Sequence, residues 1–207
     1  MIKFEKTEVL GWEAAIRGMR NPLNSWDKSD SAVVLNSAVA IGDNDLGLMT
    51  RLRNAGTDHR KFMRMIAVYV DITAPLYWWK EFDTYKVGTV ANSCSTMHKI
   101  HAKEFTLDDF SHEHLSNGFL IDLKATVDSL NEARKLFNAT KEKEYWWQMI
   151  QLLPSSFNQK RTVMLNYEVL ANMYKSRKNH KLDEWHRFCE WIEGLPYSEL
   201  IVGGKDG

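Results

Sequence analysis

The chain has 207 residues, and its 27 lysines and arginines are balanced by 27 aspartates and glutamates, so its formal net charge is zero. This balance excludes a global electrostatic attraction to nucleic acid, and any anionic ligand has to be held by a local cluster of basic side chains. The sequence contains neither a signal-peptide pattern nor a run near the roughly 18 apolar residues of a membrane span. We therefore expect a soluble, cytoplasmic protein that binds neither nucleic acid nor membrane.

Cysteine and tryptophan usage points to a compact protein without metal or disulfide scaffolding. The two cysteines, Cys94 and Cys189, give neither a disulfide framework nor a metal quartet. Eight tryptophans are spread along the chain, which is typical of core and subunit-interface packing. Because no linker or internal repeat interrupts the sequence, we expect one domain over residues 1–207.

The first quarter of the chain alternates short elements. Residues 2–9 alternate apolar and charged side chains and predict a strand. A helix follows Gly11 and ends at Asn21-Pro22, and a polar loop covers residues 25–31. Asp43 or Asn44 can cap a second helix, which Ala55-Gly56 closes.

Residues 65–73 have the period of two that is typical of a strand, because Ile66, Val68, Val70 and Ile72 alternate with other residues. Pro75 ends this strand and suits the start of a helix. After Lys86 the chain becomes small and polar through residues 88–96. Such a run can hold a phosphate with backbone N–H and hydroxyl donors, although a flexible loop has the same composition.

The second half of the chain reads as mainly helical. Residues 117–140 predict the longest helix, and its apolar stripe consists of Phe119, Leu120, Leu123, Val127, Leu130, Ala133, Leu136 and Phe137. Residues 141–153 continue as helix after a kink near residues 139–140, and Pro154 ends it. A helix carrying Asn166, Asn172 and Arg177 follows, and residues 182–193 form the last helix.

Four histidines lie between residues 98 and 114, namely His98, His101, His112 and His114. A structural zinc site needs closed ligand geometry and a supporting second shell. The histidine spacing does not demand such a site, so we predict no metal.

The stretches 55–97 and 152–193 resemble the flavin-dependent thymidylate synthases. In that family an Ala-Pro-started helix is followed by Arg-His-Arg and then by a loop with Glu, Ser and Arg. The register needs no gap: Ala74-Pro75 matches the Ala-Pro, and Thr84-Tyr85-Lys86 falls on the Arg-His-Arg. Asn92, Cys94 and Thr96 fall on the loop's Glu, Ser and Arg, and His59 falls on the histidine of the family's His-x-Ser/Thr-Pro-Phe-Glu-His segment.

The C-terminal block carries the second part of the resemblance. The family has Leu-Pro, about a dozen residues, and then Asn-x-Arg-x-x-x-Asn-x-x-x-x-Arg on one helix. Leu153-Pro154 matches the start, and Asn166, Asn172 and Arg177 keep three of the four polar positions, with Glu168 in place of the first arginine. Taken alone, these residues also fit a solvated helix face.

The resemblance implies an α/β (α+β) fold in which an antiparallel sheet is flanked by long helices. It implies FAD as cofactor, dUMP or a related pyrimidine deoxynucleotide as substrate, and NADPH and methylenetetrahydrofolate as co-substrates. It also implies a homo-oligomer, a tetramer in most family members. The implied residues are Arg177 for catalysis and substrate; His59, Lys61, Thr84, Tyr85, Lys86, Asn166 and Asn172 for the cofactor; and Glu81, Asn92, Ser93, Cys94, Ser95 and Thr96 for the substrate.

The chain departs from the family at the most charged positions. Of the Arg-His-Arg signature only Lys86 keeps a charge, and the phosphate-loop arginine is Thr96. Charge-assisted hydrogen bonds contribute on the order of 1.5–3 kcal/mol each, so their loss weakens phosphate binding. Three hypotheses follow: a divergent thymidylate synthase-like methyltransferase, an inactive relative that binds nucleotide or flavin, or a structural oligomeric protein.

Overall fold

The computed structural model describes residues 2–33 and 39–203, and these form two compact units. The first unit comprises Met1–Lys3, Asp71–Thr84 and Ala91–Thr162. The second comprises Phe4–Val70, Tyr85–Val90 and Val163–Gly207. Each unit is described by itself below, and the expectation of a single domain stays a prediction.

The helices and strands follow one another in this order: β1 (Lys3–Leu10), α1 (Trp12–Arg20), η1 (Asn21–Leu23), η2 (Trp26–Lys28), β2 (Ala32–Val33), β3 (Val39–Ala40), α2 (Asp43–Asn54), η4 (Arg60–Met65), β4 (Ala67–Pro75), α3 (Leu76–Phe82), β5 (Val90–Ser93), η5 (Leu107–Asp109), α4 (Asn117–Thr140), α5 (Lys143–Leu152), β6 (Asn158–Asn166), α6 (Tyr167–Arg177), α7 (Asp183–Glu193) and α8 (Glu199–Val202).

A four-stranded sheet has the strand order β1-β4-β6-β5. Strands β4 and β6 run antiparallel: the amide of Tyr167 donates to the carbonyl of Ile66, and the amide of Leu76 donates to the carbonyl of Phe157. The predicted alternation in β4 is confirmed, since Ile66, Val68, Val70 and Ile72 are all at most 1% exposed. The expected α+β class with an antiparallel sheet and flanking helices is confirmed.

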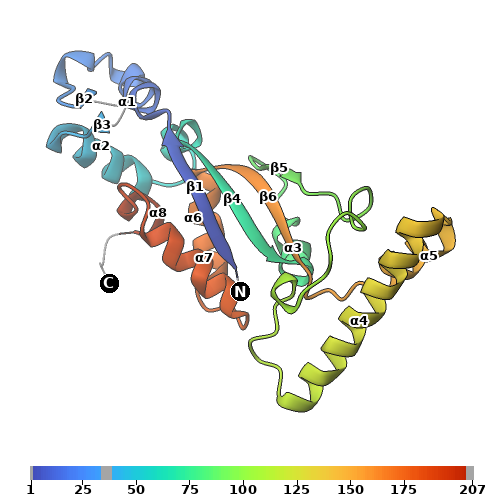
Figure 1. Ribbon diagram of the computed structural model, residues 1–207. Coiled ribbons are helices and arrows are strands. Elements are labelled where there is room, and N and C mark those ends of the chain that lie inside the picture. Colours follow the sequence, from blue (N-terminus) through green and yellow to red (C-terminus); the bar gives the residue numbers. More distant parts are fainter. Residues whose placement is uncertain (1, 34–38, 204–207) are drawn as a thin grey trace. The chain divides into compact units, whose positions relative to one another are not determined.

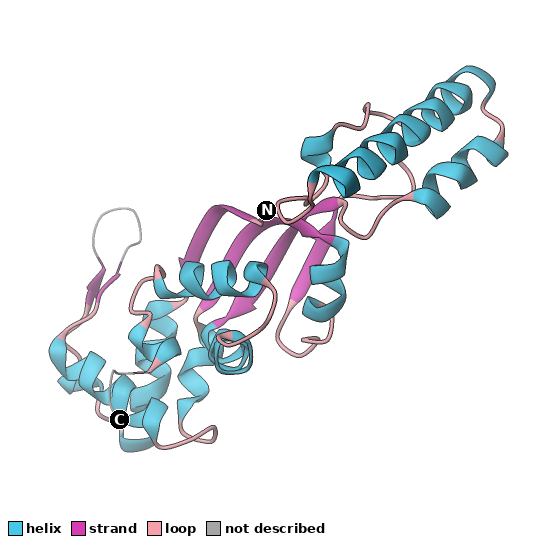
Figure 2. Cartoon of the chain, turned by 90° about the horizontal axis from the view of Figure 1, so that it is seen from below, coloured by secondary structure: helices cyan, strands magenta, loops and turns pink. Residues whose placement is uncertain are grey.

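In the first unit, α4 and α5 form a helical hairpin (Figures 1 and 2). The bounds predicted for α4 are confirmed, but the kink predicted after it is a reversal: Lys141 has φ 61° and starts the turn that leads α5 back onto α4. Their shared core consists of Ile100, Phe105, Phe110, Leu123, Val127, Leu130, Ala133 and Met149. Asn131 also anchors the preceding loop, because its side chain accepts from the amide of Phe105 (2.9 Å) and donates to its carbonyl (2.8 Å).

In the second unit, helix α6 packs against α7, α8 and η4. Figure 1 shows α6 and α7 lying side by side. The inward positions predicted for α7 are confirmed, because Trp185, Phe188, Cys189 and Ile192 are buried. Trp12 of α1 packs edge-on against Tyr167, the first residue of α6 (centroids 5.2 Å apart). The core therefore holds α6 from several directions.

Four strands were not predicted from the sequence, namely β2, β3, β5 and β6. Strand β6 occupies residues where no strand was predicted, and Asn166 was placed on a helix although it is the last residue of β6. Strand β5 lies within the predicted polar loop, and all four of its residues are exposed, so it has no apolar alternation. The predicted stripe of α4 is wrong at Phe119, which is 66% exposed.

Candidate functional site

The residues that the family resemblance assigns to a site are divided between the two units. The first unit contains Glu81, Thr84, Asn92, Ser93, Cys94, Ser95 and Thr96. The second unit contains His59, Lys61, Tyr85, Lys86, Asn166, Asn172 and Arg177. Their roles stay predictions, and the local geometry of each group is given separately.

Helix α6 organises the second group. Asn166 has extended backbone angles and acts as its N-cap, with its Oδ1 accepting a hydrogen bond from the amide of Val169 (2.9 Å). An N-cap side chain satisfies one of the amides that the first helical turn leaves without partners. Glu168 in the first turn and Arg177 in the last complement the helix dipole. Asn166 and Arg177 thus lie about 16 Å apart along the axis, at opposite ends of α6.

The segment 85–90 lies along α6, because its two ends contact opposite ends of the helix. Tyr85 contacts Arg177 at the C-terminal end. Gly88 lies against Asn166 and Val169 at the N-terminal end, where a Cβ would stand 2.9 Å from Val169 Cγ2 and 3.0 Å from Asn166 Nδ2. Gly88 has φ 75°, a conformation that favours glycine. Of the degenerate signature, Tyr85 therefore contacts the helix that carries Arg177.

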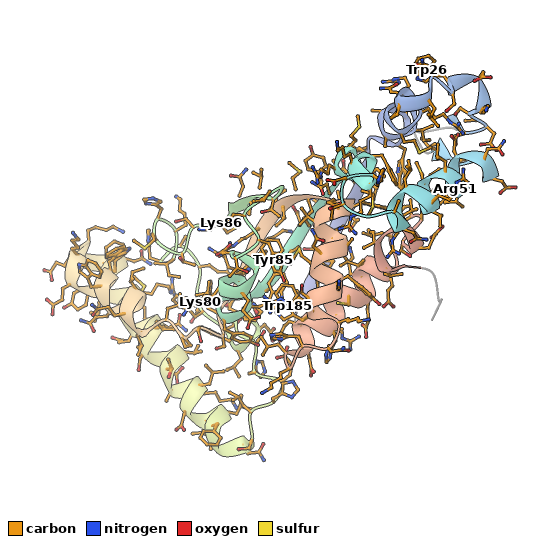
Figure 3. The ribbon with its side chains drawn as sticks, turned by 180° about the vertical axis from the view of Figure 1, so that it is seen from behind. Trp26, Arg51, Lys80, Tyr85, Lys86 and Trp185 are labelled. Carbon is orange, nitrogen blue, oxygen red and sulfur yellow. The ribbon has the colours of Figure 1, made fainter. Side chains whose placement is uncertain are left out.

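Arg177 is held by aromatic side chains. Its Nε donates a hydrogen bond to the hydroxyl of Tyr85 (2.8 Å). Its guanidinium carbon lies 5.4 Å from the centre of the Tyr85 ring and 4.6 Å from that of Trp185. Figure 3 shows Tyr85 and Trp185 close together, with Lys86 next to Tyr85. Arg177 is therefore a half-buried cation whose guanidinium has aromatic neighbours on two sides.

A second arginine joins α6 from η4. Arg60 Nε donates to Glu168 Oε1 (3.1 Å) and lies 2.9 Å from Oε2, while Nη2 donates to Asn172 Oδ1 (3.2 Å). Glu168 stands where the resemblance expects an arginine. The guanidinium on this part of α6 therefore comes from a different segment of the chain, which sequence spacing could not reveal.

Beside η4 the second unit has a cavity of about 860 Å³ between α1, α2 and η4. Basic side chains of Lys28, Arg51, His59 and Lys61 line it, together with one acidic residue, Asp58. Its apolar lining includes Leu48, Leu52, Phe62 and Met65. Two of the predicted cofactor residues, His59 and Lys61, thus line the same cavity. Lys28 and Arg51 also line it, although neither was predicted as a site residue from the sequence.

A buried ion pair supports the wall of this cavity. Arg20 Nη2 lies 2.7 Å from Asp45 Oδ1, and the two side chains are 4% and 0% exposed. Burial by itself raises the pKa of Asp45, but hydrogen bonds from Ser31, Ser29 and Arg20 outweigh it, so the pKa lies below its usual value. Asp45 therefore stays ionised and locks α2 to the loop at residues 29–31.

In the first unit the predicted phosphate loop is tied to β6. The amide of Cys94 donates to the carbonyl of Lys160 (2.9 Å), and Gln159 Nε2 donates to the carbonyl of Cys94 (2.7 Å). Ser95 Oγ accepts from the amides of Met97 (3.1 Å) and His98 (2.9 Å). The side chains of Asn92, Ser93 and Cys94 are exposed, so the loop is fixed by its backbone and presents polar groups outward.

The remaining predicted residues of the first unit lie at the end of α3. Thr84 Oγ1 donates a hydrogen bond to the carbonyl of Glu81 (2.7 Å) and so closes the last turn of the helix. Arg161, which was not predicted as a site residue, has its guanidinium carbon 4.2 Å from the ring centre of Trp79 and pairs with Asp83 (2.7 Å). Arg161 also donates to Gln159, and thereby reaches the residue that holds Cys94.

Within residues 2–33 and 39–203, no three histidine, cysteine, aspartate or glutamate side chains gather as they would around a metal ion. Over the same residues, no helix combines the length and the apolar character that crossing a membrane requires.

Solved structures with the same fold include two of flavin-dependent thymidylate synthase (ThyX) from Helicobacter pylori, both complexed with FAD and dUMP. They match with a TM-score of 0.69 at 15% and 16% sequence identity, covering 98% and 96% of this chain and 98% of theirs. A UMP/dUMP methylase, PolB from Streptomyces cacaoi bound to 5-Br dUMP, matches with a TM-score of 0.59 at 11% identity, covering 93% of this chain and 88% of that one.

The sequence itself matches no family model and no curated protein. At these identities the structural similarity concerns the fold, and it extends over nearly the whole chain. The chain therefore has the fold of the flavin-dependent thymidylate synthases, as the resemblance of its sequence implied.

Proposed function

We propose that this chain is a divergent flavin-dependent enzyme that methylates dUMP, or a related pyrimidine nucleotide, at uracil C5. In this proposal FAD is the cofactor, and methylenetetrahydrofolate and NADPH are co-substrates. The observation that carries it is the cavity of about 860 Å³ that has a basic lining and contains His59 and Lys61, in a fold whose solved examples include two complexes with FAD and dUMP.

The cavity fits a flavin nucleotide in size and chemistry. Pockets for cofactors commonly enclose about 300–1,000 Å³ and combine apolar walls with a few polar groups. Lys28, Arg51 and Lys61 supply cations for a pyrophosphate, and Leu48 and Phe62 supply apolar surface for a ring. Because the chain has no net charge, this local cluster is the kind of feature that anion binding requires.

When bound, FAD would supply the redox chemistry, and the protein would supply orientation and electrostatics. The family resemblance also assigns Asn166 and Asn172 to the flavin, but neither residue lines this cavity, and their Oδ1 atoms accept hydrogen bonds from Val169 and Arg60. Arg177 would stabilise the negative charge that develops on the uracil ring, a role that suits a fixed guanidinium. The polar groups of residues 92–96 would hold the nucleotide phosphate, and a homotetramer is the proposed assembly.

Flavin binding is tested first, with purified protein and free FAD. We expect visible flavin absorbance or saturable binding at micromolar FAD. The variant Arg51→Glu/Lys61→Glu should weaken binding at least tenfold by reversing two cavity charges, whereas Lys135→Glu on the exposed face of α4 should not. Absence of FAD binding by the wild type would overturn the flavoenzyme proposal.

Turnover is tested next with dUMP, UMP and dCMP in the presence of methylenetetrahydrofolate and NADPH, with products identified by mass spectrometry. A gain of one methyl group on a pyrimidine is the expected result. Flavin binding without turnover of any of the three nucleotides would favour the inactive, ligand-binding relative instead.

A further inference from the structure

Arg177 is restrained at two different parts of its side chain. Tyr85 accepts a hydrogen bond from Nε at 2.8 Å, and the ring of Trp185 lies 4.6 Å from Cζ. The two rings are themselves 6.3 Å apart with their planes inclined at 67°. A hydrogen bond to Nε fixes the direction of the guanidinium plane, and an aromatic face limits its rotation out of that plane. Together these contacts define one orientation of the group.

Both restraining residues are themselves anchored. Trp185 is fully buried and packs edge-on against Phe188 (5.4 Å). The turn between α6 and α7 is fixed because the amide of His180 donates to the carbonyl of Arg177 (2.9 Å) and His180 Nδ1 accepts from the amide of Leu182 (3.2 Å). Trp185 therefore has a set position relative to Arg177.

Tyr85 is anchored from the other side. Its carbonyl accepts a hydrogen bond from Thr89 Oγ1, which closes the turn that follows it. Within that turn, Gly88 lies against Asn166 and Val169 of the α6 N-terminus. The segment 85–90 therefore contacts both ends of α6 and places the hydroxyl of Tyr85 against Arg177.

We propose that Tyr85 and Trp185 are positioning residues that hold the guanidinium of Arg177 in the orientation used for an anionic pyrimidine. This inference rests on the proposed function for the identity of the ligand. A long side chain free to rotate would have to be ordered at each turnover, whereas a pre-oriented donor acts without reorganisation. Tyr85 is the more informative of the two, because its hydroxyl can be removed while its ring is kept.

The test compares Tyr85→Phe with Tyr174→Phe. Tyr174 lies on the same helix, and its hydroxyl donates to Glu193 (2.6 Å), so the control also removes one tyrosine hydroxyl bond from α6. The first readout needs no ligand: the Nε–H resonance of Arg177 in a ¹⁵N NMR spectrum, assigned through the variant Arg177→Lys. We expect Tyr85→Phe to shift this resonance and speed its exchange with water, and Tyr174→Phe to leave both unchanged.

The second readout separates orientation from affinity. In the active enzyme, Tyr85→Phe should lower kcat about 10- to 100-fold, as expected for a misplaced catalytic group, and change the KM for the nucleotide less than about threefold. Tyr174→Phe should keep wild-type kcat. An unchanged Nε–H resonance, or an unchanged kcat in an active enzyme, would overturn the positioning role.

The two proposals fail differently. A wild type without turnover of any pyrimidine nucleotide would refute the proposed function, while the Arg177 resonance would still show whether Tyr85 orients the guanidinium. Conversely, full turnover by Tyr85→Phe would leave the proposed function intact and refute this inference.

Discussion

Arg60 and Glu168, which are 108 residues apart in the sequence, form an ion pair that joins η4 to α6, with Arg60 Nε 2.9 Å from Glu168 Oε2. The side chains are 17% and 8% exposed, so water screens the pair only in part. Because η4 carries Lys61 of the basic cavity and α6 carries Arg177, this pair connects the two parts of the candidate site in the second unit.

The ion pair predicts a compensating double variant. Arg60→Met should lower the free energy of unfolding by about 2–3 kcal/mol, below the ~3–5 kcal/mol for a fully buried pair, because it leaves Glu168 without its counter-charge. Arg60→Met/Glu168→Met should recover most of that loss, since apolar pairs often replace buried ion pairs at little cost. Urea unfolding of the three proteins measures this. A double variant no more stable than the single one would show that the partners do not act as a pair.

Asp45 predicts a pH dependence of stability. Its pKa is lowered in the folded state, so the unfolded chain binds the proton more tightly and folding stability rises with pH through the acid range. The stabilisation is complete above the unfolded value of about 3.9 and is lost as pH falls through the folded value. Asp45→Asn should cost about 3–5 kcal/mol at pH 7 by leaving Arg20 unpaired.

Thermal unfolding between neutral and acid pH measures the effect of Asp45. The variant Asp45→Asn should show a shallower fall in Tm on acidification than the wild type. Asp128→Asn, on the exposed face of α4, serves as the control and should follow the wild-type curve. A wild-type slope in Asp45→Asn would contradict the assignment.

Thr96 predicts a gain of affinity. It stands where the family resemblance places a phosphate-binding arginine, and it is half-buried beside the exposed polar residues 92–95. Thr96→Arg should tighten dUMP binding about 10- to 100-fold, which corresponds to one added charge-assisted hydrogen bond of about 1.5–3 kcal/mol. Isothermal titration with dUMP and with deoxyuridine, which lacks the phosphate, separates the affinity due to the phosphate from that due to the nucleoside. Equal gains for both ligands, or a similar gain from Thr140→Arg at the end of α4, would refute the phosphate role.

Replacing Gly88 should lower folding stability for two reasons, backbone strain and steric overlap, which can be measured separately. Gly88→Ala should destabilise the protein by about 1–3 kcal/mol, because φ is 75° and the new Cβ would meet Val169 and Asn166. Gly56→Ala has φ 107° but open space, so it should show the backbone cost alone. Gly118→Ala, in helix α4 with open space, should stabilise by about 0.5–1 kcal/mol. Chemical denaturation of the three variants gives the comparison.

Sequence patterns predicted the elements whose apolar spacing is regular. Helix α4 is long and amphipathic, and β4 has one fully buried face, so both were found with nearly correct bounds. Strand β6 was missed because its inward positions include Gln159, whose side chain binds Cys94 instead of contributing an apolar residue to the alternation. The exposure of Phe119 could not be predicted either. The apolar spacing along α4 does not indicate how far its partner helix α5 extends beside it.

The candidate site was predictable only where it depends on local spacing. Asn172 and Arg177 lie on one helix as predicted, whereas Asn166 was expected on that helix and is instead its N-cap at the end of β6. The contacts that fix Arg177 and Glu168 could not be predicted, because Tyr85 and Arg60 reach α6 from about one half-chain away, 92 and 108 residues distant. Long-range pairs of this kind depend on the tertiary fold, which no local pattern in the sequence encodes.

The two cysteines differ in exposure, so selective labelling of one of them can report on the candidate phosphate loop. Burial, with neighbouring Glu193 and Glu190, raises the pKa of the Cys189 thiol to about 11, so at neutral pH it stays protonated and inaccessible to alkylating reagents. Cys94 is exposed within the predicted phosphate loop. A maleimide should therefore label Cys94 alone, and dUMP should slow that labelling while deoxyuridine should not. Mass spectrometry of the wild-type chain would thus follow occupancy of the loop without any engineered reporter.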